Sequence, residues 1–235
     1  MKKLTVYVLL FAMLFAFASC GETVDDAPIG MKLASDPEVV DYKVYVPTDW
    51  AITSKTGMTM AQVSLADASS MIVTNHSHTN TSEYRDSKNT LIAYLYGADE
   101  IKPTADTTDP ALDESKYDKD GYRKYDESLL LKEGSYLARV YSLFDTVKDE
   151  EGNVKSTFTM IEAPAFTTLK KGDGAVAAIT FTYSGVLDGA SVQQKMVLSY
   201  EDAYFYNITF STAPALYETH KATFDAILGY FTFED

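Results

Sequence analysis

The chain has a single cysteine, Cys20, among 235 residues, so no disulfide within the chain is possible and stability must come from packing. Histidine is also scarce, with three residues, and Gly-x-Ser-x-Gly elbows and glycine-rich phosphate loops are missing. No long apolar run follows residue 17. These absences argue against enzymes that use a nucleophilic serine or bind a nucleotide, and no cofactor is indicated.

The first residues have the pattern of a sorting signal. Lys2 and Lys3 precede an apolar segment, residues 4–17, and the small residues Ala18 and Ser19 follow. This pattern is typical of a secretory signal peptide. The segment is shorter than the roughly 20 apolar residues that span a bilayer as a helix. We therefore expect residues 1–19 to be a signal peptide that is removed.

The exit from this leader, Phe17-Ala18-Ser19-Cys20, resembles the lipobox of bacterial lipoproteins, although Phe17 replaces the usual leucine-like residue. The resemblance implies that the thiol of Cys20 receives a diacylglyceryl group and that Cys20 becomes the N-terminus. The mature protein is then held by membrane lipid outside the cytoplasm, at the cell surface or in the periplasm. Two other readings stay open: a signal cut elsewhere, or a leader retained as an anchor.

Charge and length describe the rest of the chain. The leader carries two of the 20 basic residues and none of the 34 acidic ones, so its removal changes the net charge from −14 to −16. Such a charge repels nucleic acid. Residues 20–40 have the composition of an acidic linker, and residues 41–235 suit a single domain with a sizeable core.

Apolar spacing predicts the elements of that domain. We expect strands at 42–46, 58–65 and 71–74, a helix that starts near Asn80 and Glu83 and stops at Gly97, and strands at 137–144 and 154–161. Alternating residues between 177 and 210, with turns at 188–189 and 201–203, predict an antiparallel meander. A last helix begins near Pro214. The expected fold class is α+β: an antiparallel meander flanked by helices in an α/β/α sandwich.

Two stretches resemble PsbP-like domains over roughly residues 42–233. Tyr42-Lys43-Val44-Tyr45-Val46-Pro47-Thr48-Asp49-Trp50 is similar to their first strand, which ends in proline, a polar gap and tryptophan. Phe224, Ile227-Leu228 and Phe231-Thr232-Phe233 resemble their last helix and closing strand. The resemblance implies an α/β/α sandwich used as a docking or accessory module, not as an enzyme. Plant members of the family help photosystem II retain calcium and chloride, and a relative of the fold binds the Ran GTPase; no ion-binding residue can be carried over.

The acidic interval 98–128 is expected to be an insertion, and loops of this length are usually functional or disordered. Tyr117, Tyr122 and Tyr125 lie there beside charged residues, which suits contact with protein or glycan. With Asp118 and Asp120 they form the possible binding loop. Asp118, Asp120, Gly121 and Glu127 also fit positions of a calcium loop, but Lys116 occupies the first ligand position, so a solvated acidic loop is the default.

The histidines suggest no metal centre. His76 and His78 could supply two of the four ligands of a tetrahedral zinc site, and we expect them to be surface residues. His220 is expected to pack half-buried on the last helix. The sequence thus favours a lipid-anchored, non-enzymatic module that binds a protein or small ligand. The alternatives are an extracytoplasmic hydrolase that acts on glycan or peptide through carboxylates, and a calcium-binding surface protein.

Overall fold

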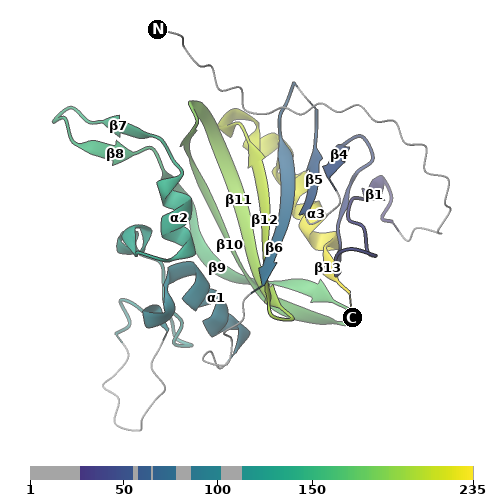
Figure 1. Ribbon diagram of the computed structural model, residues 1–235, viewed down its shortest axis with the longest axis horizontal. Helices are drawn as coiled ribbons and strands as arrows, with labels where there is room; N and C mark the ends of the chain where they lie inside the picture. The colour runs from purple at the N-terminus through teal and green to yellow at the C-terminus, as the bar shows by residue number, and fades with distance from the viewer. Residues whose placement is uncertain (1–26, 55–57, 65, 78–85, 102–112, 235) are drawn as a thin grey trace.

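Alternating apolar side chains build one large sheet, and the helices cover it. The computed structural model describes residues 27–54, 58–64, 66–77, 86–101 and 113–234 (Figure 1). The strands are β1 (Met31–Leu33), β2 (Tyr42–Lys43), β3 (Tyr45–Pro47), β4 (Ala51–Ser54), β5 (Met58–Gln62), β6 (Ser70–Ser77), β7 (Thr146–Lys148), β8 (Val154–Ser156), β9 (Thr159–Lys171), β10 (Gly174–Leu187), β11 (Ala190–Glu201), β12 (Tyr204–Thr212) and β13 (Thr232–Phe233). The helices are α1 (Ser87–Tyr96), η1 (Ala98–Glu100), η2 (Glu127–Leu131), α2 (Tyr136–Ser142), η3 (Pro214–Leu216) and α3 (Tyr217–Tyr230).

Nine strands form the main sheet, in the order β2-β13-β9-β10-β11-β12-β6-β5-β4. All neighbours in it are antiparallel except β13 and β9, which are parallel, so the sheet is mixed. Two small sheets, β1-β3 and β7-β8, stand apart from it. The fold class is α+β, as the sequence predicts, with a large curled sheet and three α-helices in the described ranges.

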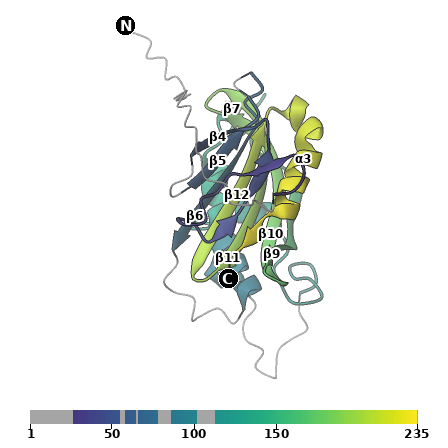
Figure 2. The ribbon, with the colours of Figure 1, turned by 90° about the vertical axis from the view of Figure 1, so that its right-hand side faces the viewer.

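The strands bury side chains on both faces of the sheet. On β10, Ile179, Phe181 and Tyr183 pack into one core cluster with α1 and α2, whereas Ala178 belongs to a second cluster with Phe224 of α3. Figure 1 shows α1 and α2 on one side of the sheet and α3 on the other, and Figure 2 shows α3 running along the sheet. Two separate cores therefore share one sheet, as expected for a helix, sheet, helix arrangement.

The predicted meander is confirmed. Strands β9 to β12 follow one another through three antiparallel hairpins. Asp188 and Gly189 have φ values of +49° and +79°, the backbone that two-residue hairpin turns require. The turn at Asp202 and Ala203 also has positive φ values, +46° and +66°. Turn chemistry and two-residue alternation thus agree, which is why this region was predictable.

The predicted strand at 137–144 is wrong, because the segment forms helix α2. Ser135 caps this helix by accepting a hydrogen bond from the Ala138 N–H at 3.0 Å. Leu137, Val140 and Phe144 are buried, at helical spacings of three and four residues, whereas Leu143 is 68% exposed. The segment was predicted as a strand with two apolar faces because apolar residues also lie outside the buried face of this helix.

Three other boundaries differ from expectation. Helix α1 begins after Asp86, whose carboxylate accepts a hydrogen bond from the Asn89 N–H at 2.8 Å, while Asn80 and Glu83 lie outside the described residues. The segment predicted as a strand at 154–161 is divided between β8 and β9. Residues 31–33, expected in the linker, form β1 and pair with β3, so the folded part begins before residue 41.

The two ends of the domain follow the prediction. β2 and β3 lie within 42–47, and the Trp50 N–H donates to the Pro47 carbonyl at 3.0 Å in the turn that follows. Pro214 starts η3, which leads into α3. Trp50 and Phe224 then pack edge to face, with ring centroids 6.3 Å apart, so the first turn of the domain contacts its last helix.

Candidate functional site

The described part of the insertion is tied to the domain by one buried cation, Arg123. Its Nε donates to Glu100 at 2.7 Å and its Nη2 to Asp126 at 2.5 Å. Its Nη1 donates to the carbonyl of Lys124 at 2.7 Å, and only 5% of the side chain is exposed. Lys132 adds a further bridge to Glu100 at 3.0 Å. These contacts join residues 113–131, which we call the clamped segment, to η1, which directly follows α1.

Ion pairing fixes the protonation of this region. Hydrogen bonds from Lys132 lower the pKa of Asp99. Hydrogen bonds from Ser128 and then Arg123 lower the pKa of Asp126. Burial alone raises the pKa of Glu100, but hydrogen bonds from Arg123 and Lys132 outweigh burial and lower it. All three carboxyl groups are therefore ionised at neutral pH.

The turn within the clamped segment is organised by Asp118. Its Oδ1 accepts hydrogen bonds from the N–H groups of Asp120 and Tyr122, both at 2.9 Å. Gly121 has a φ of +87°, which glycine adopts without strain. The backbones of Tyr117 and Arg123 form an isolated antiparallel β-bridge across the turn. Asp118 thus holds its own loop, and within the described ranges no three His, Cys, Asp or Glu side chains gather around a possible cation.

A pocket of about 320 Å³, which we call the insertion pocket, lies between the clamped segment, α1, β9 and β10. Tyr122 and Phe166 form its aromatic wall, with ring centroids 5.0 Å apart and an interplanar angle of 66°. Lys88 Nζ lies 5.1 Å from the centroid of each ring. The lining comprises Lys88, Ile92, Tyr96, Asp118, Asp120, Tyr122, Arg123, Lys124, Pro164, Ala165, Phe166 and Ile179.

Of the residues predicted for a binding loop, Asp118, Asp120 and Tyr122 line this pocket. Tyr117 and Tyr125 do not; Tyr125 packs against the core cluster beneath α1, and burial raises its pKa. The sequence analysis missed Lys88 and Phe166, because each comes from a distant part of the chain. Arg123 was also missed, although it is the only arginine in the acidic interval 98–128, which was a usable signal.

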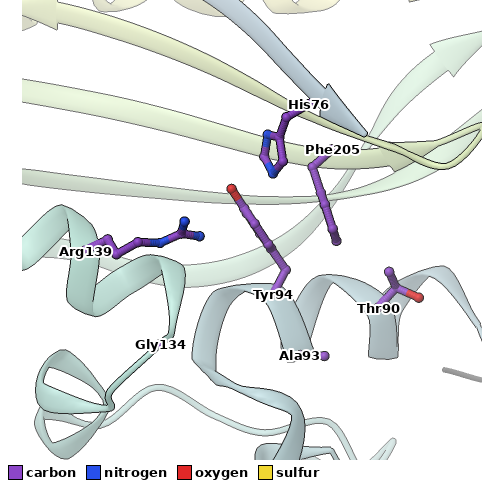
Figure 3. Close-up of a pocket in the computed structure, with 7 residues that line it drawn as sticks. All are labelled: His76, Thr90, Ala93, Tyr94, Gly134, Arg139 and Phe205. Atoms are coloured by element: carbon purple, nitrogen blue, oxygen red, sulfur yellow. The ribbon is translucent and has the colours of Figure 1, made fainter. Parts of the chain in front are cut away.

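A second pocket, the aromatic pocket, lies on the other side of α1 (Figure 3) and has a volume of about 310 Å³. Its lining is His76, Thr90, Ala93, Tyr94, Gly134, Arg139 and Phe205. Tyr94 is stacked between Phe205 and Tyr136, with centroid distances of 4.0 and 4.8 Å. Helix α1 therefore separates two pockets that draw on different side chains.

The histidines occupy two different environments. His76 on β6 is exposed as expected, but its ring lies 5.3 Å from that of Tyr94 and 5.6 Å from that of Phe205. His78 lies outside the described residues. His220 on α3 is half-buried, as predicted, and its Nε2 lies 2.8 Å from Asp67 Oδ2. Burial alone raises the pKa of Asp67, but hydrogen bonds from Ser69 and His220 outweigh it and lower the pKa.

Two further predictions concern the membrane. Cys20 lies outside the described residues, so lipid attachment stays a prediction. In the part of the chain that the structure describes, no helix is both long and apolar enough to cross a bilayer.

Comparison with known proteins gives similarities of fold alone. No protein-family model and no curated protein matches the chain. The solution structure of cyanobacterial PsbP (CyanoP) from Synechocystis is 13% identical, with a TM-score of 0.46, over 91% of this chain and 98% of that chain. The crystal structure of LpqN, involved in cell envelope biogenesis of Mycobacterium tuberculosis, is 11% identical, with a TM-score of 0.43, over 86% of this chain and 89% of that chain. The α+β arrangement is thus similar to that of PsbP, but similarities with TM-scores below 0.5 assign neither an activity nor a partner.

Proposed function

We propose that this chain is a lipid-anchored, extracytoplasmic binding protein without enzymatic activity, and that its insertion pocket holds a sugar or a short stretch of glycan. The observation that carries the proposal is the insertion pocket itself. It joins an aromatic wall, Tyr122 and Phe166, to the charged side chains of Lys88, Asp120 and Lys124 within about 320 Å³. Pockets of this size with a few polar groups hold small ligands.

The chemistry of the lining suits a sugar. A sugar ring has an apolar face of C–H groups that packs against an aromatic ring, and hydroxyl groups that both donate and accept hydrogen bonds. Asp120 supplies an acceptor, with its side chain 54% exposed, and the lysines supply donors. The Asp118 carboxylate is already used within its own turn, where it positions Tyr122. Asp120 pairs with the exposed Lys119 at 3.1 Å, a contact that a ligand hydroxyl can replace.

The clamped segment supports binding because it is already in place. Arg123 fixes both ends of the turn through the carbonyls of Lys116 and Lys124, at 3.3 and 2.7 Å. A pocket wall that is ordered before the ligand arrives avoids the entropy cost of ordering it on binding. The described part of the insertion is therefore better explained as a pocket wall than as a spacer.

The carboxyl groups that pair with Arg123 and Lys132 favour a structural role over a role as the acid of a hydrolase. A glycosidase needs one carboxylic acid that remains protonated, through a raised pKa, to donate to the leaving group. Asp99, Glu100 and Asp126 have lowered pKa values instead. Their ion pairs with Arg123 and Lys132 serve to hold the clamped segment.

The membrane part of the proposal rests on Cys20 and the leader before it. Two or more acyl chains at one residue give durable attachment, because each buried methylene contributes about 0.8 kcal/mol. Mass spectrometry of the protein from its bacterial host should find residues 1–19 removed and Cys20 acylated. A Cys20→Ser variant should move from the membrane to the soluble fraction. An unmodified Cys20 thiol in the native protein contradicts the anchor.

A glycan array tests the ligand. The chain should bind one or more saccharides, and Tyr122→Ala should lower the signal about tenfold or more, because it removes the stacking wall. Tyr230→Ala is a matched control: Tyr230 is 44% exposed on α3, and Lys170 lies 5.9 Å from its ring centroid. The control should bind as the unchanged chain does. Equal loss in both variants, or no saccharide bound at all, contradicts the proposal.

A further inference from the structure

We propose that the aromatic pocket is a second, independent site, which binds the carboxylate group of a small organic acid. The pocket opens between α1, α2 and the paired strands β6 and β12 (Figure 3). Its charged or titratable lining residues are Arg139, His76 and Tyr94, and the lining contains no acidic residue. The chain as a whole has a net charge of −14, but this lining has one cation and no carboxylate, so locally it favours an anion.

Arg139 supplies the positive charge. It is exposed on α2, and its guanidinium lies 5.8 Å from the ring centroid of Tyr94 and 5.5 Å from that of Tyr136. The guanidinium is within cation–π distance of both rings, and its N–H groups can still donate hydrogen bonds. The ion pairs found in the described ranges include no carboxylate within 4.0 Å of Arg139. A planar guanidinium matches a carboxylate through two parallel hydrogen bonds.

The Tyr94 hydroxyl is a second donor directed into the same space. Figure 3 shows the Tyr94 hydroxyl and the His76 ring directed toward the region that the Arg139 guanidinium faces, each from a different element. Burial raises the pKa of Tyr94, although the Asn207 side chain and Arg139 reduce the rise. The phenol is therefore protonated at neutral pH and can donate to an anionic oxygen. Two donors, Tyr94 on α1 and Arg139 on α2, thus face one position for an oxyanion, and the His76 ring lines it from β6.

The size of the pocket favours a ligand that has an organic group attached to its carboxylate. An inorganic oxyanion leaves most of about 310 Å³ unfilled, whereas an organic acid fills it. Phe205 and Ala93 provide the apolar part of the lining. Phe205 is 1% exposed and Tyr94 is stacked on it at 4.0 Å, so this wall is rigid. An aromatic or aliphatic carboxylic acid matches both parts of the pocket.

A titration followed by NMR tests the site with defined probes. Benzoate should bind the purified full chain saturably, with resonance changes at Tyr94, Arg139 and His76. Benzamide, which is neutral and nearly the same shape, should bind at least about tenfold more weakly, because charge-assisted hydrogen bonds are lost. Equal affinity for benzoate and benzamide overturns the proposal. Tighter binding of inorganic phosphate than of benzoate overturns the assignment to a carboxylate.

Variants separate this site from the insertion pocket. Arg139→Gln should lower benzoate affinity about tenfold or more, and Arg139→Lys should restore part of the loss, because it keeps the charge without the paired N–H groups. Lys88→Gln, in the insertion pocket, should leave benzoate binding unchanged. Loss of benzoate binding in Lys88→Gln, with Arg139→Gln unaffected, contradicts the second site. Failure of the glycan array has no bearing on this result.

Discussion

Replacing Arg123 with methionine tests whether one buried cation holds the clamped segment. Methionine keeps an unbranched apolar stem close to that of arginine but removes every N–H donor. Two carboxylates then lose a partner: Glu100, at 2.7 Å with its side chain 18% exposed, and Asp126, at 2.5 Å and 45% exposed. The carbonyl of Lys124 loses its donor as well.

The magnitude follows from what remains after the change. Removing one partner of a buried ion pair typically costs about 3–5 kcal/mol, because a charge is left buried. Here Glu100 keeps Lys132 at 3.0 Å, and Asp126 is exposed enough to be hydrated. We therefore expect Arg123→Met to lower the free energy of unfolding by about 2–3 kcal/mol.

Urea denaturation and amide hydrogen exchange measure the effect. Exchange should accelerate at the Asp118 and Lys124 N–H groups, which donate to the carbonyls of Tyr122 and Lys116 at 2.9 and 2.8 Å. Lys119→Met is the control: Lys119 pairs with Asp120 at 3.1 Å with 88% of its side chain exposed, so the change should cost less than about 0.5 kcal/mol. Equal small effects in both variants, with unchanged exchange, refute the reasoning.

Three further predictions concern packing in the two cores and the contact between Asp67 and His220. Gly185→Ala should cost about 1–3 kcal/mol in urea denaturation, because a Cβ there would lie 2.3 Å from the Phe144 ring; a cost near zero contradicts this packing. Phe224→Ala should cost about 3–5 kcal/mol, since Phe224 is 0% exposed, and a loss below about 1 kcal/mol would mean that α3 is loosely packed. The lowered pKa of Asp67 means that the unfolded state binds more protons near and below pH 3.8, so this group's contribution is present above that pH and is lost as the pH falls through the folded pKa. Asp67→Asn should therefore flatten the acid side of the stability profile, and an unchanged profile contradicts the role given to its contact with His220.

The sheet was predictable where local signals agree. Between residues 174 and 212, strand alternation and the turns at Asp188-Gly189 and Asp202-Ala203 specify the same hairpins, so register follows from sequence. Helix α2 failed this test, because apolar residues at 137, 140 and 144 fit a helix while their neighbours fit a strand. Ser135 caps the helix, but a serine at this position indicates a helix start only when the helix is already known.

The pockets were much less predictable than the sheet. Tyr122, Asp118 and Asp120 carried a compositional signal, but Lys88 and Phe166 reach the same pocket from α1 and β9. Such a convergence depends on long-range packing, which no local pattern encodes. The ion pair between Arg123 and Glu100, which holds the clamped segment, was equally hard to predict. The two residues are 23 positions apart and meet only in the tertiary fold.

The most direct test of the account is an NMR titration of the chain with the soluble saccharide that gives the strongest signal on the array. The account predicts saturable resonance changes at Tyr122, Phe166 and Lys88, with the residues of the aromatic pocket and of α3 unchanged. Changes confined to α3, or the same changes in the Tyr122→Ala variant, would contradict a sugar site in the insertion pocket.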